Sequence, residues 1–289
     1  MDTQQIIKPA ISIVIPVYGQ LHLLMECLVS LAKTTSGLPV QFICVDDATP
    51  EFNLMDVPLP ISCAVVRQQA NQGFAASCNA GAKHALADVI LFLNSDTVAH
   101  DGWLPPLLST FNNSVGIVGP KLVFPQEFWC QQCRVYGPIL CPQHPNDCQP
   151  VERIQSCGGW FDAKKGPFHR YFMWRSDDPV VNECESVSWT TGAAIAIRAD
   201  VFKAAEGFDM GYQRAYFEDV DMCMRVKKAG LSVMYQPQSI FTHKVGQSTG
   251  AASDPLQAAR RFQANSRRFH TIWDADIMVD TPGVVYVNY

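Results

Sequence analysis

Short apolar segments alternate with segments of helical spacing along the first third of the chain. The segment ISIVIPV at 11–17 is apolar and β-branched throughout, as expected of a strand that is buried on both faces. Further strands are predicted at 40–47, 61–68 and 88–94, and helices at 21–35 and 73–87. Strands that alternate with helices at these spacings predict an α/β fold with a mostly parallel central sheet flanked by helices.

Composition narrows the class of protein. The chain has 289 residues, of which 48% are hydrophobic and 17% charged, enough for one large domain or two small ones. The formal net charge is -5, so no basic field of the whole protein points to nucleic acid, and the sequence shows no clear nucleic-acid patch. No apolar run approaches the roughly 20 residues of a membrane span, and the start MDTQQIIKPA lacks the pattern of a signal peptide. We therefore expect a cytoplasmic protein whose eleven cysteines are reduced.

Polar side chains follow several of the predicted strands. Tyr18, Asp46, Asp47 and Asp96 stand at strand ends, where parallel sheets bind their ligands. The sequence contains neither GxGxxG after the first strand nor GxxxxGK[ST], so dinucleotide and P-loop sites lose their main support. A carboxylate beside hydroxyls, without a basic phosphate cradle, fits a hard divalent cation that carries a phosphate ligand. Alternatively, Asp96 caps a helix that begins near residue 101 or stabilises a turn.

Acidic residues recur in the second half. The segment 188–209 predicts a strand, a helix and a glycine turn, and 216–230 opens a helix with Glu218, Asp219 and Asp221. Acids in a first helical turn also simply favour the helix dipole. The segment 231–248 predicts two short strands that end at His243, which by itself could equally be a surface residue.

Several of these stretches together resemble family 2 glycosyltransferases of the GT-A fold. The matching stretches are SIVIPVY (12–18), VDDAT (45–49), NQGFAASCNAG (71–81), ILFLNSDT (90–97), GWL (102–104), VGPKL (118–122), TGAAIAIR (191–198), GFD (207–209), FEDVDMCMRVKKAG (217–230) and His243. SCGGWFD at 156–162 is similar to the rhamnosyltransferase-like branch. The resemblance implies one GT-A domain over 1–253, with a C-terminal helix and tail over 254–289 packed on it.

The resemblance also implies an activity and its residues. The chain would move a sugar, with inversion, from a nucleotide-diphosphate sugar to an acceptor hydroxyl, in polysaccharide or glycoconjugate synthesis. The donor would be a UDP- or dTDP-sugar, and the acceptor a glycan, a lipid-linked molecule or another hydroxyl. The implied nucleotide-sugar-binding residues are Pro16, Tyr18, Asp47, Asn71, Gly73, Ser95, Asp96, Thr191 and Gly192. Asp96 and His243 would bind the divalent cation, Asp219 would be the general base, Glu218 would contact a sugar and Asp221 the helix end.

The implied residue types suit this chemistry. A departing nucleoside diphosphate develops negative charge that a divalent cation neutralises, and a carboxylate must take the proton of the acceptor hydroxyl. Two departures stand out: Gly19 replaces the asparagine that relatives often have, and only one acid lies at 94–96. One carboxylate and one imidazole suit Mn²⁺ or Mg²⁺.

Two other classes compete with the transferase. A sugar-nucleotide pyrophosphorylase needs a glycine-rich basic loop after the first strand, and PVYGQLHL at 16–23 offers none. A non-catalytic sugar-nucleotide or glycan-binding module remains the alternative, although loss of activity should erase the acids first. Release of nucleoside diphosphate from the donor distinguishes the transferase from the binding module.

The largest departure from relatives is a cysteine-rich insertion at about 125–153. Cys130 and Cys133 have the tight spacing of a zinc knuckle, and Cys141 with Cys148 could complete a structural Cys₄ site. His144 could replace either of the last two cysteines. Free thiols on a flexible loop and disulfides are the alternatives.

The tail at 254–274 predicts an amphipathic helix. Its apolar residues are Leu256, Ala259, Phe262, Phe269 and Trp273, and its cations are Arg260, Arg261, Arg267 and Arg268. We expect this helix to pack over the sheet with its arginines in solvent, and a peripheral membrane contact is the alternative. The segment 278–289 would add an edge strand or cross the surface.

Overall fold

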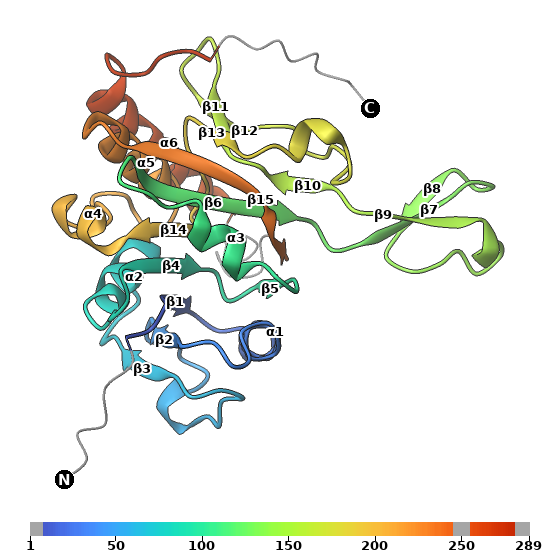
Figure 1. The fold of residues 1–289 in the computed structure, drawn as a ribbon, viewed down its shortest axis with the longest axis horizontal. Coiled ribbons are helices and arrows are strands. Elements are labelled where there is room, and N and C mark those ends of the chain that lie inside the picture. Colours follow the sequence, from blue (N-terminus) through green and yellow to red (C-terminus); the bar gives the residue numbers. More distant parts are fainter. Residues whose placement is uncertain (1–7, 245–254, 281–289) are drawn as a thin grey trace.

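The computed structural model describes residues 8–244 and 255–280 and shows a twisted central sheet with helices on both faces (Figure 1). The order of its main strands is β13-β15-β6-β14-β4-β1-β2-β3, with β10 paired to β6 and β5 to β15. These strands are β1 Ile11–Val17, β2 Val40–Asp46, β3 Ala64–Arg67, β4 Val89–Leu93, β5 Thr97–Ala99, β6 Val115–Val123, β10 Ile154–Ser156, β13 Glu185–Ser186, β14 Ala194–Arg198 and β15 Ser232–His243.

Most of the sheet is parallel. Strand β1 pairs in parallel with β2 and β4, β2 with β3, and β6 with β15. Strand β14 runs antiparallel to both of its neighbours, β4 and β6. The carboxyl ends of β1, β4, β6 and β15 therefore lie at one edge of the sheet. The predicted α/β class with a mostly parallel sheet is confirmed.

The helices cover two faces of the sheet and enclose two apolar cores. They are α1 Leu21–Thr34, α2 Phe74–Ala82, α3 Leu104–Ser109, α4 Ala199–Ala204, α5 Glu218–Lys228 and α6 Pro255–Trp273, with short 3₁₀ turns at Leu54–Asp56, Pro145–Asp147 and Pro179–Val181. One core gathers side chains of α1 and α3, and the other those of α2, α4, α5 and α6. Small residues let α2 approach closely, since a Cβ at Gly81 would lie 2.4 Å from Val14.

Three details differ from the sequence prediction. Instead of two short strands, 232–243 forms the single strand β15, whose register shifts between Gln236 and Ile240. At this irregularity the pairing of β15 with β6 is interrupted, but the strand itself continues. Helix α2 ends at Ala82 rather than near residue 87, and the helix expected near residue 101 begins at Leu104.

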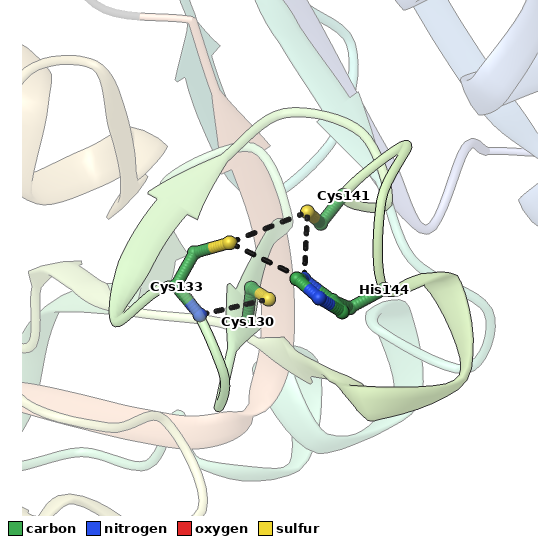
Figure 2. Close-up of side chains that lie close together, drawn as sticks. All are labelled: Cys130, Cys133, Cys141 and His144. Atoms are coloured by element: carbon green, nitrogen blue, oxygen red, sulfur yellow. Dashed lines mark hydrogen bonds between the residues drawn. The ribbon is translucent and has the colours of Figure 1, made fainter.

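The insertion at 125–153 forms a small sheet of its own that projects from the body (Figure 1). Its strands are β7 Glu127–Cys130, β8 Val135–Gly137 and β9 Cys148–Val151, in the order β8-β7-β9. The insertion leaves from the carboxyl end of β6 and returns through β10, which pairs with β6. Between its strands, Cys130, Cys133, Cys141 and His144 point toward one another (Figure 2). After it, β11 Gly159–Phe161 and β12 Pro167–His169 form a hairpin.

Helix α6 packs on the domain mainly through its second half. Asn265, Phe269 and Trp273 are buried, whereas Leu256 and Phe262 of the predicted apolar side are 63% and 47% exposed. The predicted apolar side of the helix is therefore wrong over the first turns, where Leu256 is exposed. The buried side of the helix contains Asn265 instead. Among the helices in the described residues, none is long and apolar enough to cross a membrane. Most of the predicted tail strand, residues 281–289, lies outside the described residues.

Candidate active site

A pocket of about 590 Å³ lies at the edge of the sheet where the parallel strands end. Every residue predicted to bind donor or catalytic metal, or to act in catalysis, lines it: Pro16, Tyr18, Asp47, Asn71, Gly73, Ser95, Asp96, Thr191, Gly192, Glu218, Asp219 and His243. These residues come from segments that are more than 200 positions apart in the chain. No residue of the insertion at 125–153 is among the lining residues.

Asp47 organises one wall of the pocket. It is 4% exposed, and its carboxylate accepts hydrogen bonds from the backbone N–H groups of Gln72 and Gly73, both at 2.8 Å, and from Nε2 of Gln68 at 2.9 Å. Burial raises the pKa of Asp47 even though the two backbone donors act in the opposite direction. Gly73 has a φ of +88°, and a Cβ there would lie 2.5 Å from the Cα of Arg214, so the turn requires glycine. Three donors already occupy Asp47, and contact with a nucleotide base stays a prediction.

Asp96 and His243 lie together in the pocket. Nε2 of His243 is 3.2 Å from Oδ1 of Asp96, and the residues are 6% and 2% exposed. Strand pairing of β15 with β5 places His243 opposite Thr97, the neighbour of Asp96. Among the described residues, no group donates a hydrogen bond to either carboxylate oxygen of Asp96. A buried carboxylate beside an imidazole, with acceptor capacity unused, has the donor set that a divalent cation needs. The alternative role of Asp96 as a helix cap is wrong, because α3 begins well after it, at Leu104.

Two polar residues that lie beside His243 were not identified from the sequence. Oε1 of Gln155, on β10, lies 3.4 Å from Nδ1 of His243. His169 on β12 contacts the hydroxyl of Ser156 at 3.1 Å, and burial, followed by the charge of His243, lowers the pKa of His169 to about 4. Their segment directly follows the insertion, and nothing in the local pattern marks it as part of a strand-end site.

Asp219 and Glu218 begin helix α5 and face the same pocket. Oδ2 of Asp219 accepts the N–H of Gly192 at 2.7 Å, and Oδ1 accepts that of Val220 at 2.8 Å. Since a carboxylate offers about four acceptor positions, Asp219 can still accept a proton. Burial raises the pKa of Asp219. Burial, together with the charge of Asp219, raises the pKa of Glu218 to about 8. Oε2 of Glu218 is buried and has no hydrogen-bond partner among the described residues.

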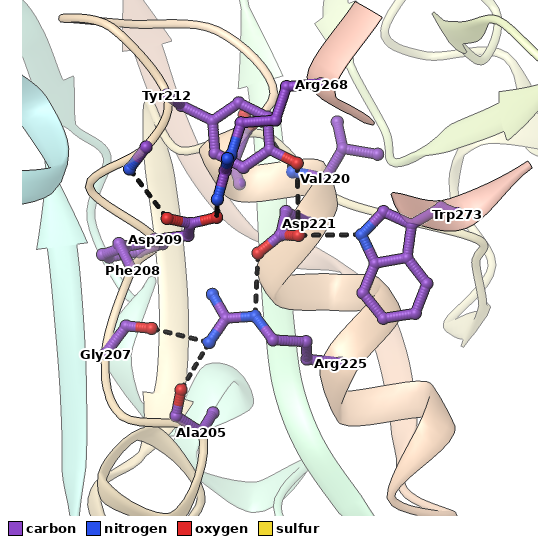
Figure 3. A network of polar contacts seen from close by, with 12 residues as sticks. Ala205, Gly207, Phe208, Asp209, Tyr212, Val220, Asp221, Arg225, Arg268 and Trp273 are labelled. Carbon is purple, nitrogen blue, oxygen red and sulfur yellow. Dashed lines mark hydrogen bonds and ion pairs between the residues drawn. The ribbon is translucent and has the colours of Figure 1, made fainter. Parts of the chain in front are cut away.

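Asp221 contacts tertiary partners rather than the helix end (Figure 3). Its carboxylate accepts hydrogen bonds from the hydroxyl of Tyr212 at 3.2 Å, Nε1 of Trp273 at 2.8 Å and Nε of Arg225 at 2.7 Å. The predicted helix-end role was wrong because these side chains, from the loop before α5 and from α6, reach the carboxylate. Asp221 thus fastens α5 to α6 and lies outside the pocket.

Comparison with known proteins agrees with this arrangement. Residues 12–132 match the family model described as glycosyl transferase family 2. A solved structure of GalNAc-T7 with UDP, GalNAc and Mn²⁺ is similar to this chain, with a TM-score of 0.61 and 17% sequence identity. The similarity covers 81% of this chain and 44% of that one. This similarity confirms the GT-A fold.

Curated relatives point to the same family. The pre-mycofactocin glycosyltransferase of Mycobacterium tuberculosis is 28% identical over 81% of this chain and 42% of its own length. The N-acetylglucosaminyl-diphospho-decaprenol L-rhamnosyltransferase of the same species is 38% identical over 32% of this chain and 31% of its own. The chain spans less than half the length of these relatives. Together the matches confirm the predicted resemblance to family 2 glycosyltransferases.

Proposed function

We propose that this chain is an inverting glycosyltransferase that moves a hexosyl or deoxyhexosyl group from a nucleotide-diphosphate sugar to an acceptor hydroxyl. The observation that carries the proposal is the pocket itself. It brings the buried carboxylate of Asp96, which lies beside the imidazole of His243, into one cavity with an acidic pair, Glu218 and Asp219. A transferase needs these two functions, one on the leaving group and one on the acceptor.

Asp96 and His243 would hold the divalent cation. Mn²⁺ or Mg²⁺ bound there supplies positive charge next to the departing diphosphate. The proposal is supported by the two oxygens of Asp96, neither of which accepts a hydrogen bond among the described residues, and by the Mn²⁺ named for the solved structure of GalNAc-T7. Oε1 of Gln155 lies near Nδ1 of His243, the ring nitrogen that does not contact Asp96, and would hold the orientation of the imidazole.

Asp219 would act as the general base. The acceptor oxygen forms a bond to the anomeric carbon, the bond from that carbon to the diphosphate breaks, and the hydroxyl proton passes to Asp219. The two backbone N–H groups on Asp219 fix its carboxylate without occupying all of its acceptor positions. Glu218, whose pKa burial raises to about 8, would donate a hydrogen bond to a sugar oxygen in its protonated form.

The donor would be a UDP- or dTDP-sugar, bound along Pro16, Tyr18, Asp47, Asn71 and Gly73 and beside Ser95, Thr191 and Gly192. All of these residues line the pocket. The acceptor would belong to a glycan, a lipid-linked molecule or another hydroxyl compound. A cytoplasmic location and a peripheral membrane contact through α6 also stay predictions.

The test is an assay of donor turnover. The purified chain is incubated with UDP-, dTDP- and GDP-sugars and Mn²⁺, and release of nucleoside diphosphate is measured with and without simple alcohol acceptors. We expect release with one donor class and a product whose anomeric configuration, read by NMR, is opposite to that of the donor. Donor binding without any release would instead support the non-catalytic binding module, and retention of configuration would refute the inverting mechanism.

A further inference from the structure

The cysteine-rich insertion has almost no apolar core of its own. Within 125–153 only Cys130 and Val151 are buried. Several large apolar side chains are exposed instead, namely Val135, Tyr136, Ile139 and Leu140. An ordered segment of this length that buries so little surface needs another source of stability. The rings of Trp129 and Tyr136, tilted by 40° with centroids 4.4 Å apart, contact each other at only one end of it.

Four possible metal ligands fill the centre of the insertion (Figure 2). The ligand atoms of Cys130, Cys133, Cys141 and His144 all lie within 4.8 Å of one another. The Sγ atoms of Cys133 and Cys141 are 3.8 Å apart, and Nδ1 of His144 is 3.3 Å from the first and 3.9 Å from the second. Sulfurs bound tetrahedrally to one zinc at about 2.3 Å are separated by about 3.8 Å. The ligand atoms are therefore already spaced for a shared ion.

The four ligands come in two turns of equal spacing. Cys130 and Cys133 bracket one turn, in which the N–H of Cys133 donates to Sγ of Cys130 at 3.4 Å. Cys141 and His144 bracket the other, in which the N–H of His144 donates to the carbonyl of Cys141 at 3.2 Å. Arg134, directly after the first turn, has a φ of +56°. Each turn presents two ligands to the same point, as in a knuckle with i and i+3 ligands.

We propose that Cys130, Cys133, Cys141 and His144 form a closed structural zinc site that holds the insertion in shape. Three thiolates and one imidazole are ligands that zinc prefers, and four protein ligands leave no open position for chemistry. The site is separate from the pocket, since none of its residues lines that cavity.

Cys148 has a different role from the one expected in a Cys₄ site. Its Sγ accepts the N–H of Cys141 at 3.2 Å and donates to the carbonyl of His144 at 3.3 Å. These hydrogen bonds hold the backbone of the second turn, so Cys148 supports two of the ligands but is not itself a ligand. The separation of 3.8 Å between Cys133 and Cys141 also far exceeds the roughly 2.05 Å of a disulfide.

The test is elemental analysis of the full chain purified without added metal. We expect about one zinc per chain, lost on Cys133→Ser with Cys141→Ser and on His144→Ala. Cys148→Ser and Cys184→Ser, an exposed cysteine elsewhere, should retain it. Asp96→Ala should also retain it, which excludes the catalytic pocket as its source.

A second measurement does not depend on the folding of any variant. Wild-type protein is stripped with a chelator and refilled with Co²⁺. The visible absorption of tetrahedral cobalt and a thiolate charge-transfer band should appear, and proteolysis within 125–153 should slow. Zinc content no higher than in the Cys133→Ser, Cys141→Ser double variant overturns the proposal. A disulfide within the insertion, found by mass spectrometry under non-reducing conditions, would also overturn the proposal. Loss of zinc in Cys148→Ser but not in His144→Ala would overturn the ligand set.

Discussion

Asp219 and Glu218 are neighbours on one helix, yet the surroundings of their carboxyl oxygens differ. Asp219 accepts two backbone hydrogen bonds, whereas Oε2 of Glu218 has no partner among the described residues. Burial raises the pKa of both carboxyl groups, and the backbone hydrogen bonds to Asp219 act in the opposite direction. We therefore make a separate prediction for each of the two residues.

Under the proposed mechanism, Asp219→Asn removes the general base. We expect turnover to fall by roughly 10²–10⁴-fold, with donor affinity nearly unchanged. The amide would also present N–H groups to a backbone donor, so a stability loss of about 1–3 kcal/mol is expected. Steady-state kinetics and calorimetry of donor binding measure the two effects. Asp200→Asn, an exposed acid on α4, is the matched control. Near-wild-type transfer by Asp219→Asn would exclude this residue as the base.

Glu218 should make the stability of the protein depend on pH. Its pKa is raised from 4.5 to about 8 by folding, so the folded state binds its proton more tightly than the unfolded state. Its contribution is therefore complete below pH 4.5 and is lost as the pH rises through about 8. Glu218→Gln should remove this loss.

Thermal unfolding at several pH values checks the prediction. The Tm of Glu218→Gln relative to wild type should increase from pH 5 to pH 9, by about 2–4 °C for each kcal/mol regained. Glu183→Gln, an exposed glutamate, should show no such trend. A constant difference across this range would mean that Glu218 ionises normally in the folded protein.

At the scale of elements, helix α6 holds the loop that precedes the acidic pair. Asn265 is 1% exposed and accepts the N–H of Gln213 at 2.9 Å. Its amide donates to the carbonyls of Gln213, Ala215 and Tyr216 at 3.2, 2.8 and 3.1 Å. Tyr216 and Phe217 have φ values of +81° and +75°, which bulky residues adopt only under outside constraint. Asn265 supplies that constraint through its hydrogen bonds, and we expect it to position Asp219.

Asn265→Ala should loosen this loop without removing any group from the pocket. Up to four hydrogen bonds are lost, and we expect kcat to fall while the pH profile keeps its shape, because the base itself is unchanged. Hydrogen exchange of the amides of 213–217 should accelerate, and the protein should lose about 1–3 kcal/mol of stability. Gln263→Ala, exposed on the same helix, is the control. Unchanged exchange in the loop would show that α6 does not position it.

At the scale of the whole molecule, donor and metal should stabilise the fold together. A ligand that binds only the folded state adds about 2.7 kcal/mol at a concentration of 100 Kd. A thermal-shift screen of nucleotide sugars with Mn²⁺ should therefore raise Tm by roughly 5–10 °C for the preferred donor. Asp96→Ala and His243→Ala should each reduce the metal-dependent part of this shift. An equal Mn²⁺-dependent shift in wild type and both variants would contradict the assigned ligands.

The sequence by itself determined the local features of this protein. Strand and helix positions follow from apolar spacing, because a buried strand and an amphipathic helix each require a pattern that repeats over a few residues. Asp47 and Asp96 were placed near a site for the same reason, since strand ends are local and parallel strands share one edge. The motif order was enough to predict the GT-A fold, which the comparisons confirm.

Only the tertiary structure decided which distant groups meet. The pairing of β15 with β5 brings His243 to Asp96, and the return of β10 along β6 brings Gln155 to His243. Spacing allowed either Cys148 or His144 to face Cys133, and the fold of the insertion selected His144. Local sequence specifies elements through short-range periodicity. Contacts between residues far apart depend instead on strand order, register and side-chain direction, which are fixed only when the whole core packs.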